Sequence, residues 1–222
     1  MSHFARIVSL ALIMGAGACG DGADRAPPFR YPAGSRERPE GLGSRGSAAG
    51  FPSVFAIDPK DHVGQTFEAT PTLYAYVTPA EGGEDRVRLL VRVVPFRSPF
   101  IFDGPAIEVA VPAEEGLVPI YLEGSELRLL VDTLYAWQVT ALQIVDGDER
   151  VDQAEGYIVR IPEAVGGMPQ SGTGAGHTVW LIEQGVWYDA FAAVAGGGPG
   201  WARSRDEMIE RARGLVAQPS GS

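Results

Sequence analysis

The sequence predicts a mainly β protein: an immunoglobulin- or fibronectin-like antiparallel β-sandwich over residues 51–163, followed by a C-terminal helical hairpin. Three observations predict this fold. Apolar and polar side chains alternate with a period of two from Phe51 to Pro162, turn residues separate the alternating segments, and helical periodicity follows from residue 177. Six or seven short strands spaced in this way are typical of an antiparallel sandwich.

The strands follow from alternation and from β-forming residues. Residues 72–77 alternate first, and residues 87–96 place aliphatic side chains on one strand face and Arg88 and Arg92 on the other. The same reasoning predicts four further strands, at residues 106–111, 117–122, 134–145 and 150–161.

Two local signals refine the middle of this domain. Asp146-Gly147 is the strongest hairpin signal in the chain, because a type I′ turn requires positive φ. Tyr135, Trp137 and Val139 fall on one strand face and resemble the tyrosine corner of fibronectin-type and immunoglobulin-like sandwiches, in which a Tyr at a strand start bonds back to the preceding turn. An ordinary buried aromatic pair and an aromatic platform for a ligand are the alternative interpretations.

After the predicted strands, the sequence contains a Gly-rich segment and then a segment with helical periodicity. Residues 164–176 are expected to be a Gly-rich loop, and its Gly172–Gly176 run lacks the sequence context of a phosphate-binding loop. Residues 177–217 are predicted to be helical, with Gly185 dividing the first stretch and Ser204–Glu207 predicting a capping box. Helices this short are marginal alone, so we expect them to pack on each other and on the sheet.

The N-terminal region predicts export. Residues 1–18 are expected to be a signal peptide, since Arg6 precedes an apolar run that is too short to span a bilayer. The run ends in Ala16-Gly-Ala-Cys19, which resembles the lipobox of bacterial lipoproteins, and that resemblance implies acylation of Cys19. Simple cleavage and an uncleaved anchor are the alternatives. Residues 19–50, rich in Gly, Pro, Ser and Arg, are predicted to be a disordered linker.

The folded part of the chain is acidic. The sequence has 18 Lys and Arg residues and 28 Asp and Glu residues; six of the former and four of the latter precede Phe51, so the remainder carries about −12. Such a body repels nucleic acid and anionic lipid head groups, which argues against a nucleic-acid partner. Cys19 is the only cysteine, so no disulfide can form within the chain.

No residue pattern predicts a catalytic or metal site, and no cofactor is expected. His62 and His177 have no catalytic motif nearby and are interpreted as surface histidines. Asp146, Asp148 and Asp152 carry oxygen ligands suited to Ca²⁺, but their loop lacks the Gly and Glu that an EF-hand uses. We therefore favour a solvated hairpin at these aspartates.

Four aromatic residues gather in the helical region. Their simplest interpretation is packing between the helices and the sheet. If two of them remain exposed, they would form a contact surface for a partner protein or a sugar ring. The residues are Trp180, Trp187, Tyr188 and Trp201.

One segment of this region also carries a family resemblance. Gly185-Val-Trp-Tyr-Asp-Ala190, followed by an Ala-rich helix, resembles the C-terminal signature of an uncharacterised exported bacterial family, domain of unknown function nine-two-eight. The upstream order is similar, with residues 71–76, the Tyr135-x-Trp137 pair and residues 155–160. The resemblance covers about residues 60 to 196 and departs from the family at the middle strands. It implies an exported sandwich-plus-helix protein and no assigned reaction.

These features predict an exported, lipid-anchored protein of the bacterial cell envelope, facing the periplasm or the outside, that binds an envelope protein or glycan without catalysis. An envelope hydrolase or carbohydrate-acting protein is the alternative. It requires a concave pocket with two carboxylates or a His–carboxylate pair. A purely structural, oligomerising module would instead show a large apolar patch on the helical tail.

Overall fold

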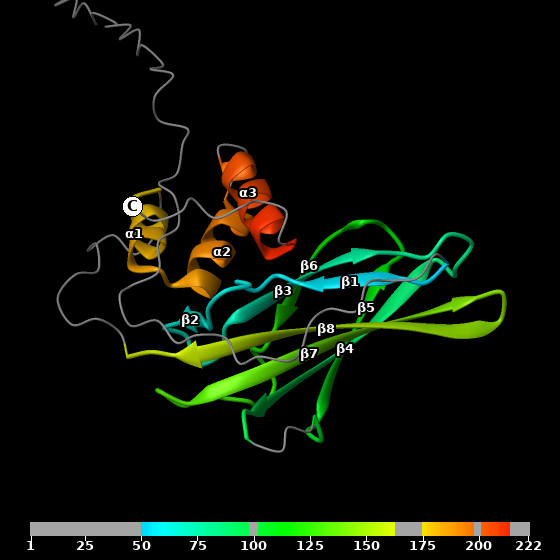
Figure 1. Ribbon diagram of the computed structural model, residues 1–222, viewed down its shortest axis with the longest axis horizontal. Coiled ribbons are helices and arrows are strands. Elements are labelled where there is room, and N and C mark those ends of the chain that lie inside the picture. Colours follow the sequence, from blue (N-terminus) through cyan, green and yellow to red (C-terminus); the bar gives the residue numbers. More distant parts are fainter. Residues whose placement is uncertain (1–49, 98–101, 163–174, 198–200, 214–222) are drawn as a thin grey trace, which may run out of the picture.

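A computed structural model describes residues 50–97, 102–162, 175–197 and 201–213 (Figure 1). The predicted signal peptide, Cys19, nearly all of the linker and most of the Gly-rich loop lie outside these residues. The described elements follow one another as eight strands and then three helices: β1 (Ser53–Ala56), β2 (Gly64–Thr66), β3 (Thr72–Thr78), β4 (Arg86–Pro95), β5 (Ala106–Pro112), β6 (Gly116–Tyr121), β7 (Leu134–Val145), β8 (Asp148–Arg160), α1 (Ala175–Gln184), α2 (Trp187–Gly196) and α3 (Ala202–Arg213).

The strands form two sheets that share one core. The smaller sheet has the order β1-β3-β6, and the larger has the order β2-β8-β7-β4-β5. Buried side chains from both sheets, such as Leu73 and Val77 on β3 and Leu89 and Val91 on β4, belong to a single apolar cluster. The prediction of a mainly β protein with C-terminal helices is confirmed, and one pair, β2 with β8, is parallel rather than antiparallel.

Alternation along β4 and β7 explains this packing. Val87, Leu89 and Val91 are fully buried, whereas Arg88 on the opposite face is exposed, as the sequence pattern predicts. At the predicted hairpin, Asp146 and Gly147 have φ of 53° and 86°. This turn joins β7 and β8 into the longest antiparallel pair of the described residues.

The tyrosine corner is also present. The backbone N–H of Leu130 donates a hydrogen bond of 3.1 Å to the hydroxyl oxygen of Tyr135, at the start of β7. Tyr135, Trp137 and Val139 are all buried on the inner face of the strand. The bond ties the irregular segment before β7 to the sandwich.

The C-terminal region contains three helices, and the first two are divided at Gly185, as the sequence predicts. Gly185 has φ of 71° and ends α1, with the N–H groups of Gly185 and Val186 donating to the carbonyl oxygens of Ile182 and Leu181. This Schellman arrangement separates α1 from α2. The predicted capping box is wrong, because α3 begins at Ala202 and places Ser204 inside the helix.

Helices α2 and α3 form a third layer over the outer face of the smaller sheet, and α1 packs beside α2 (Figure 1). The ring of Phe191 on α2 meets that of Tyr74 on β3 edge-on at 4.9 Å. The Arg213 guanidinium on α3 lies 4.1 Å from the ring centroid of Tyr76, also on β3. The larger sheet lies on the other side of the smaller one, so its outer face turns away from the helices.

Candidate functional site

The Gly185–Ala190 segment places a tyrosine hydroxyl at the centre of a buried polar network. The Tyr188 hydroxyl donates to Oδ1 of Asp58 at 2.7 Å and accepts from Nε1 of Trp137 at 2.8 Å. It also lies 3.1 Å from the carbonyl oxygen of Tyr157. Asp58, Trp137 and Tyr188 are each at most 2% exposed, so these bonds form without competition from bulk water.

Two glycines make room for this network. A Cβ atom at Gly64 on β2 would overlap the ring of Tyr188. A Cβ atom at Gly156 on β8 would overlap the indole of Trp137 and lie 3.0 Å from Cβ of Asp58. The side chains at both positions are therefore limited to hydrogen by close approach rather than by backbone conformation.

Asp189, the next residue of α2, forms a second polar contact with β2 and its following loop. Its carboxylate accepts a hydrogen bond of 2.5 Å from the hydroxyl of Thr66 and another of 2.8 Å from the backbone N–H of Phe67. Burial raises the pKa of Asp189 to about 6, against the opposing effect of these two hydrogen bonds, while nearby Glu68 raises it further. The position in the first turn of α2 suits a carboxylate, because the N–H groups at a helix N-terminus favour negative charge.

Together these contacts fix α2 to the larger sheet and to the segment that follows β1. We call Asp58, Trp137, Tyr188 and Asp189, with their hydrogen-bond partners, the interlayer clamp. Trp187 adds a long hydrogen bond of 3.5 Å from its Nε1 to the carbonyl oxygen of Ile57. The consecutive Trp-Tyr-Asp side chains of the signature therefore contact the β1–β2 region and hold α2 against it.

The aromatic residues proposed as partner contacts divide into two pairs. Trp187 and Tyr188 are core residues and are not available to a partner in this structure. Trp180 and Trp201 are only partly buried. The Trp180 ring stacks on Phe67 with centroids 5.8 Å apart, and on His177 at 6.0 Å. A contact role for Trp180 and Trp201 stays a prediction, as does acylation of Cys19.

The other polar candidates have local partners. His62 lies 3.1 Å from a carboxylate oxygen of Asp61, and both are partly exposed. In the β7–β8 hairpin, Asp148 pairs with Arg150 at 3.6 Å, and Asp152 accepts 2.9 Å from the backbone N–H of Val54. The described ranges contain no group of three or more His, Cys, Asp or Glu side chains placed to hold a metal ion.

The outer face of the larger sheet carries a mixed polar surface. Strand register aligns its outward residues in rows across β4, β7 and β8. One row contains Arg92, Gln138 and Glu155, with Nε2 of Gln138 donating to Glu155 at 3.1 Å. Apolar side chains also occur in these rows, as at Leu90 and Leu142.

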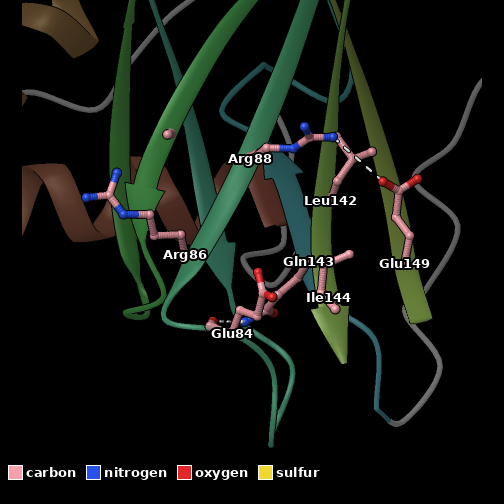
Figure 2. Close-up of a pocket in the computed structure, with 8 residues that line it drawn as sticks. Glu84, Arg86, Arg88, Leu142, Gln143, Ile144 and Glu149 are labelled. Carbon is pink, nitrogen blue, oxygen red and sulfur yellow. Dashed lines mark hydrogen bonds and ion pairs between the residues drawn. The ribbon is translucent and has the colours of Figure 1, made fainter. Parts of the chain in front are cut away.

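A depression of about 350 Å³ lies at one end of this outer face (Figure 2). Figure 2 shows Arg88 directed toward Glu149, to which its guanidinium is paired at 3.6 Å, while Arg86 points away from both. Arg88 and Glu149 are each about half exposed. The lining residues are Glu84, Arg86, Arg88, Ala110, Leu142, Gln143, Ile144 and Glu149.

Gln143 holds the loop that borders the depression. Its side-chain oxygen accepts a hydrogen bond of 2.8 Å from the backbone N–H of Ala80. Its Nε2 donates a hydrogen bond of 2.8 Å to the carbonyl oxygen of Glu84. Gln143 is 2% exposed, so these two bonds make it a fixed part of the rim. Sequence reasoning missed the depression, because its lining comes from the loop before β4 and from four strands, and no local pattern relates these residues.

Comparison with known proteins supplies the family and no activity. No curated protein matches the chain. None of the described helices is long and apolar enough to cross a membrane. The model of the family described as Domain of Unknown Function (DUF928) matches residues 34–197, which include the whole sandwich, the interlayer clamp and α2. The chain belongs to this family.

Proposed function

We propose that the protein is an exported, lipid-anchored module of the bacterial cell envelope that binds an envelope partner through the outer face of its larger sheet. The observation that carries the binding role is the separation of the two sides of the molecule. Asp58, which is buried, and Asp189, which is partly buried, hydrogen-bond within the interlayer clamp, whereas the outer face carries partly exposed charged and amide side chains such as Arg92 and Gln138. Such a surface is suited to recognition rather than to proton transfer.

The tether is supported by the sequence. The apolar leader ends in small residues directly before Cys19, and about thirty residues of linker composition separate Cys19 from β1. A Gly-rich chain of that length has a root-mean-square reach of roughly 30 Å. More than one acyl chain at Cys19 would provide the two hydrophobic signals that stable membrane attachment requires. The tether would leave the acidic body free to orient toward its partner.

The binding face is tested by site-specific photo-cross-linking in cells. A photoreactive residue at Arg92, in the outward row with Gln138 and Glu155, should yield a discrete adduct with an envelope component. The same residue at Arg203, exposed on α3 in the opposite layer, serves as the matched control. Equal cross-linking from both positions, or adducts only from Arg203, would contradict the assignment of the face.

An envelope hydrolase remains the second candidate because of the depression. Two carboxylates, Glu84 and Glu149, line it, which meets the residue requirement of that function. However, Glu149 is paired with Arg88 and both are about half exposed, so water screens the charges that catalysis would use. Hydrolysis of an isolated envelope polysaccharide that disappears in Glu149→Gln would favour this candidate over the binding module.

A further inference from the structure

Three of the four sheet edges in the described part of the chain are protected. In β1, which has four residues, the N–H of Val54 donates to Oδ2 of Asp152 at 2.9 Å. In β6, Pro119 interrupts the row of donors in the middle of the strand. In the larger sheet, β2 has only three residues, and its Gly64 packs beneath Tyr188. Short strands, prolines and side-chain covers are the usual means of preventing pairing between molecules.

Among the described residues, the fourth edge, β5, is neither short nor interrupted by a proline in its interior. It is seven residues long and pairs only with β4 within the described residues. Its single proline is the last residue, Pro112, and it contains no lysine or arginine. Ile107, Val109 and Val111 alternate along its inner side and are only partly buried. A strand of this length and composition is a template for pairing with another strand.

We propose that β5 pairs with β5 of a second copy of the chain, antiparallel about a two-fold axis at Val109. In this register Val109 faces its own copy, Ile107 faces Val111, and Ala106 faces Pro112. The only charged residue of the strand, Glu108, then lies opposite Ala110, which is small and exposed. The strand is therefore complementary to itself, as a two-fold contact requires.

Charge favours this orientation over the parallel one. An in-register parallel pair would place Glu108 beside Glu108, and like charges directly opposite destabilise a sheet. In the antiparallel register each Glu108 stays beside Arg88 of its own chain, at 4.0 Å. The two larger sheets would join into one, and their outer faces would form a continuous surface. The inference goes beyond the proposed function and stands without it.

The surroundings of β5 also predict how the contact responds to salt. Asp103 precedes the strand, and Glu114 and Glu115 follow it. The antiparallel register brings the beginning of one strand to the end of the other, so these acids repel across the contact. Added salt screens such repulsion, and the association should therefore become stronger as ionic strength rises.

The experiment uses the full chain with Cys19→Ser, kept in mild detergent, so that an introduced cysteine is the only thiol. Val109→Cys should cross-link to its copy with a short thiol-reactive linker at least tenfold more efficiently than Ala106→Cys. At position 109 the two Cβ atoms face each other, whereas at position 106 the two residues lie roughly 20 Å apart along the strands. Equal cross-linking at the two positions would overturn the proposed register.

Two substitutions of opposite charge at Ala110 provide an independent test. Both should leave the fold intact, because Ala110 is exposed. Ala110→Glu places a second carboxylate opposite Glu108 and should raise the dimer dissociation constant at least tenfold in sedimentation equilibrium, whereas Ala110→Lys should not raise it. A chain that stays monomeric at all concentrations and salt levels would overturn the proposal. A second result would also overturn the proposal: the Val109→Cys chain stays monomeric but cross-links in cells to a different polypeptide. In that case β5 pairs with that polypeptide and not with a second copy of the chain.

Discussion

Removing one hydroxyl from the interlayer clamp should destabilise the whole protein. Tyr188→Phe keeps the ring that packs over Gly64 and deletes only the atom that joins α2 to Asp58 and to Trp137 on β7. The Nε1–H of Trp137 then loses its 2.8 Å acceptor in a site with no exposure, and Asp58 loses a 2.7 Å donor in an equally buried site. The change is therefore a test of buried polar contacts at nearly constant volume.

The magnitude follows from the cost of unsatisfied buried groups. Each of the two lost bonds costs about 1–3 kcal/mol when the remaining partner cannot reach water. Because both bonds share one oxygen and Asp58 keeps another interaction, their contributions are not additive, and we expect a total loss of about 2–4 kcal/mol in the free energy of unfolding. Domains of this size have only about 5–15 kcal/mol in total, so the effect should be large.

Urea unfolding followed by tryptophan fluorescence measures this loss directly. The matched control is Tyr121→Phe, since Tyr121 is 63% exposed at the end of β6 and its hydroxyl reaches solvent. The control should change the free energy of unfolding by no more than about 0.5 kcal/mol. A Tyr188→Phe effect below about 1 kcal/mol would refute the argument, because water would then have to satisfy the abandoned groups.

The other predictions concern the same contacts. Gly64→Ala should lower the free energy of unfolding by about 1–3 kcal/mol, because the added Cβ overlaps the Tyr188 ring. Gly116→Ala is the control and should be nearly neutral, because an added Cβ there meets open space. Equal effects of the two substitutions in urea unfolding would contradict the packing argument. The raised pKa of Asp189 means that the folded state binds a proton more tightly than the unfolded state, so its contribution to stability is largest below about pH 4 and falls as pH rises toward 6. The free energy of unfolding of Asp189→Asn, relative to that of the wild type, should therefore rise by about 3 kcal/mol between pH 4 and pH 7. A difference in the free energy of unfolding that does not change with pH would refute this.

The sandwich could be predicted because its signals are local. Alternation identified six of the strands, and Asp146-Gly147 identified the hairpin, since a turn with positive φ has a strong residue preference. The two short strands β1 and β2 were missed, because three or four residues give too little alternation to recognise. The start of α3 was misplaced because Ser204 has the residue type of a cap but lies within the helix.

The interlayer clamp could not be predicted from local pattern. Asp58 and Tyr188 are 130 residues apart, and Thr66 and Asp189 are 123 residues apart, so no periodicity relates them. The resemblance of the Gly185–Ala190 segment to a family signature indicated that it matters but gave no role. Tertiary contact supplies that role: the side chains that appeared available for binding at Trp187 and Tyr188 are used to hold the layers together.

The central claim of the proposed function is that the mature protein works outside the cytosol on a lipid tether at Cys19, and intact-mass analysis of the membrane fraction tests it most directly. The predicted result is a chain that begins at Cys19 and carries diacylglycerol on its sulfur, with Cys19→Ser giving unmodified chain only. Recovery of the wild-type protein as an unprocessed chain, starting at Met1 and soluble in the cytosol, would contradict the claim.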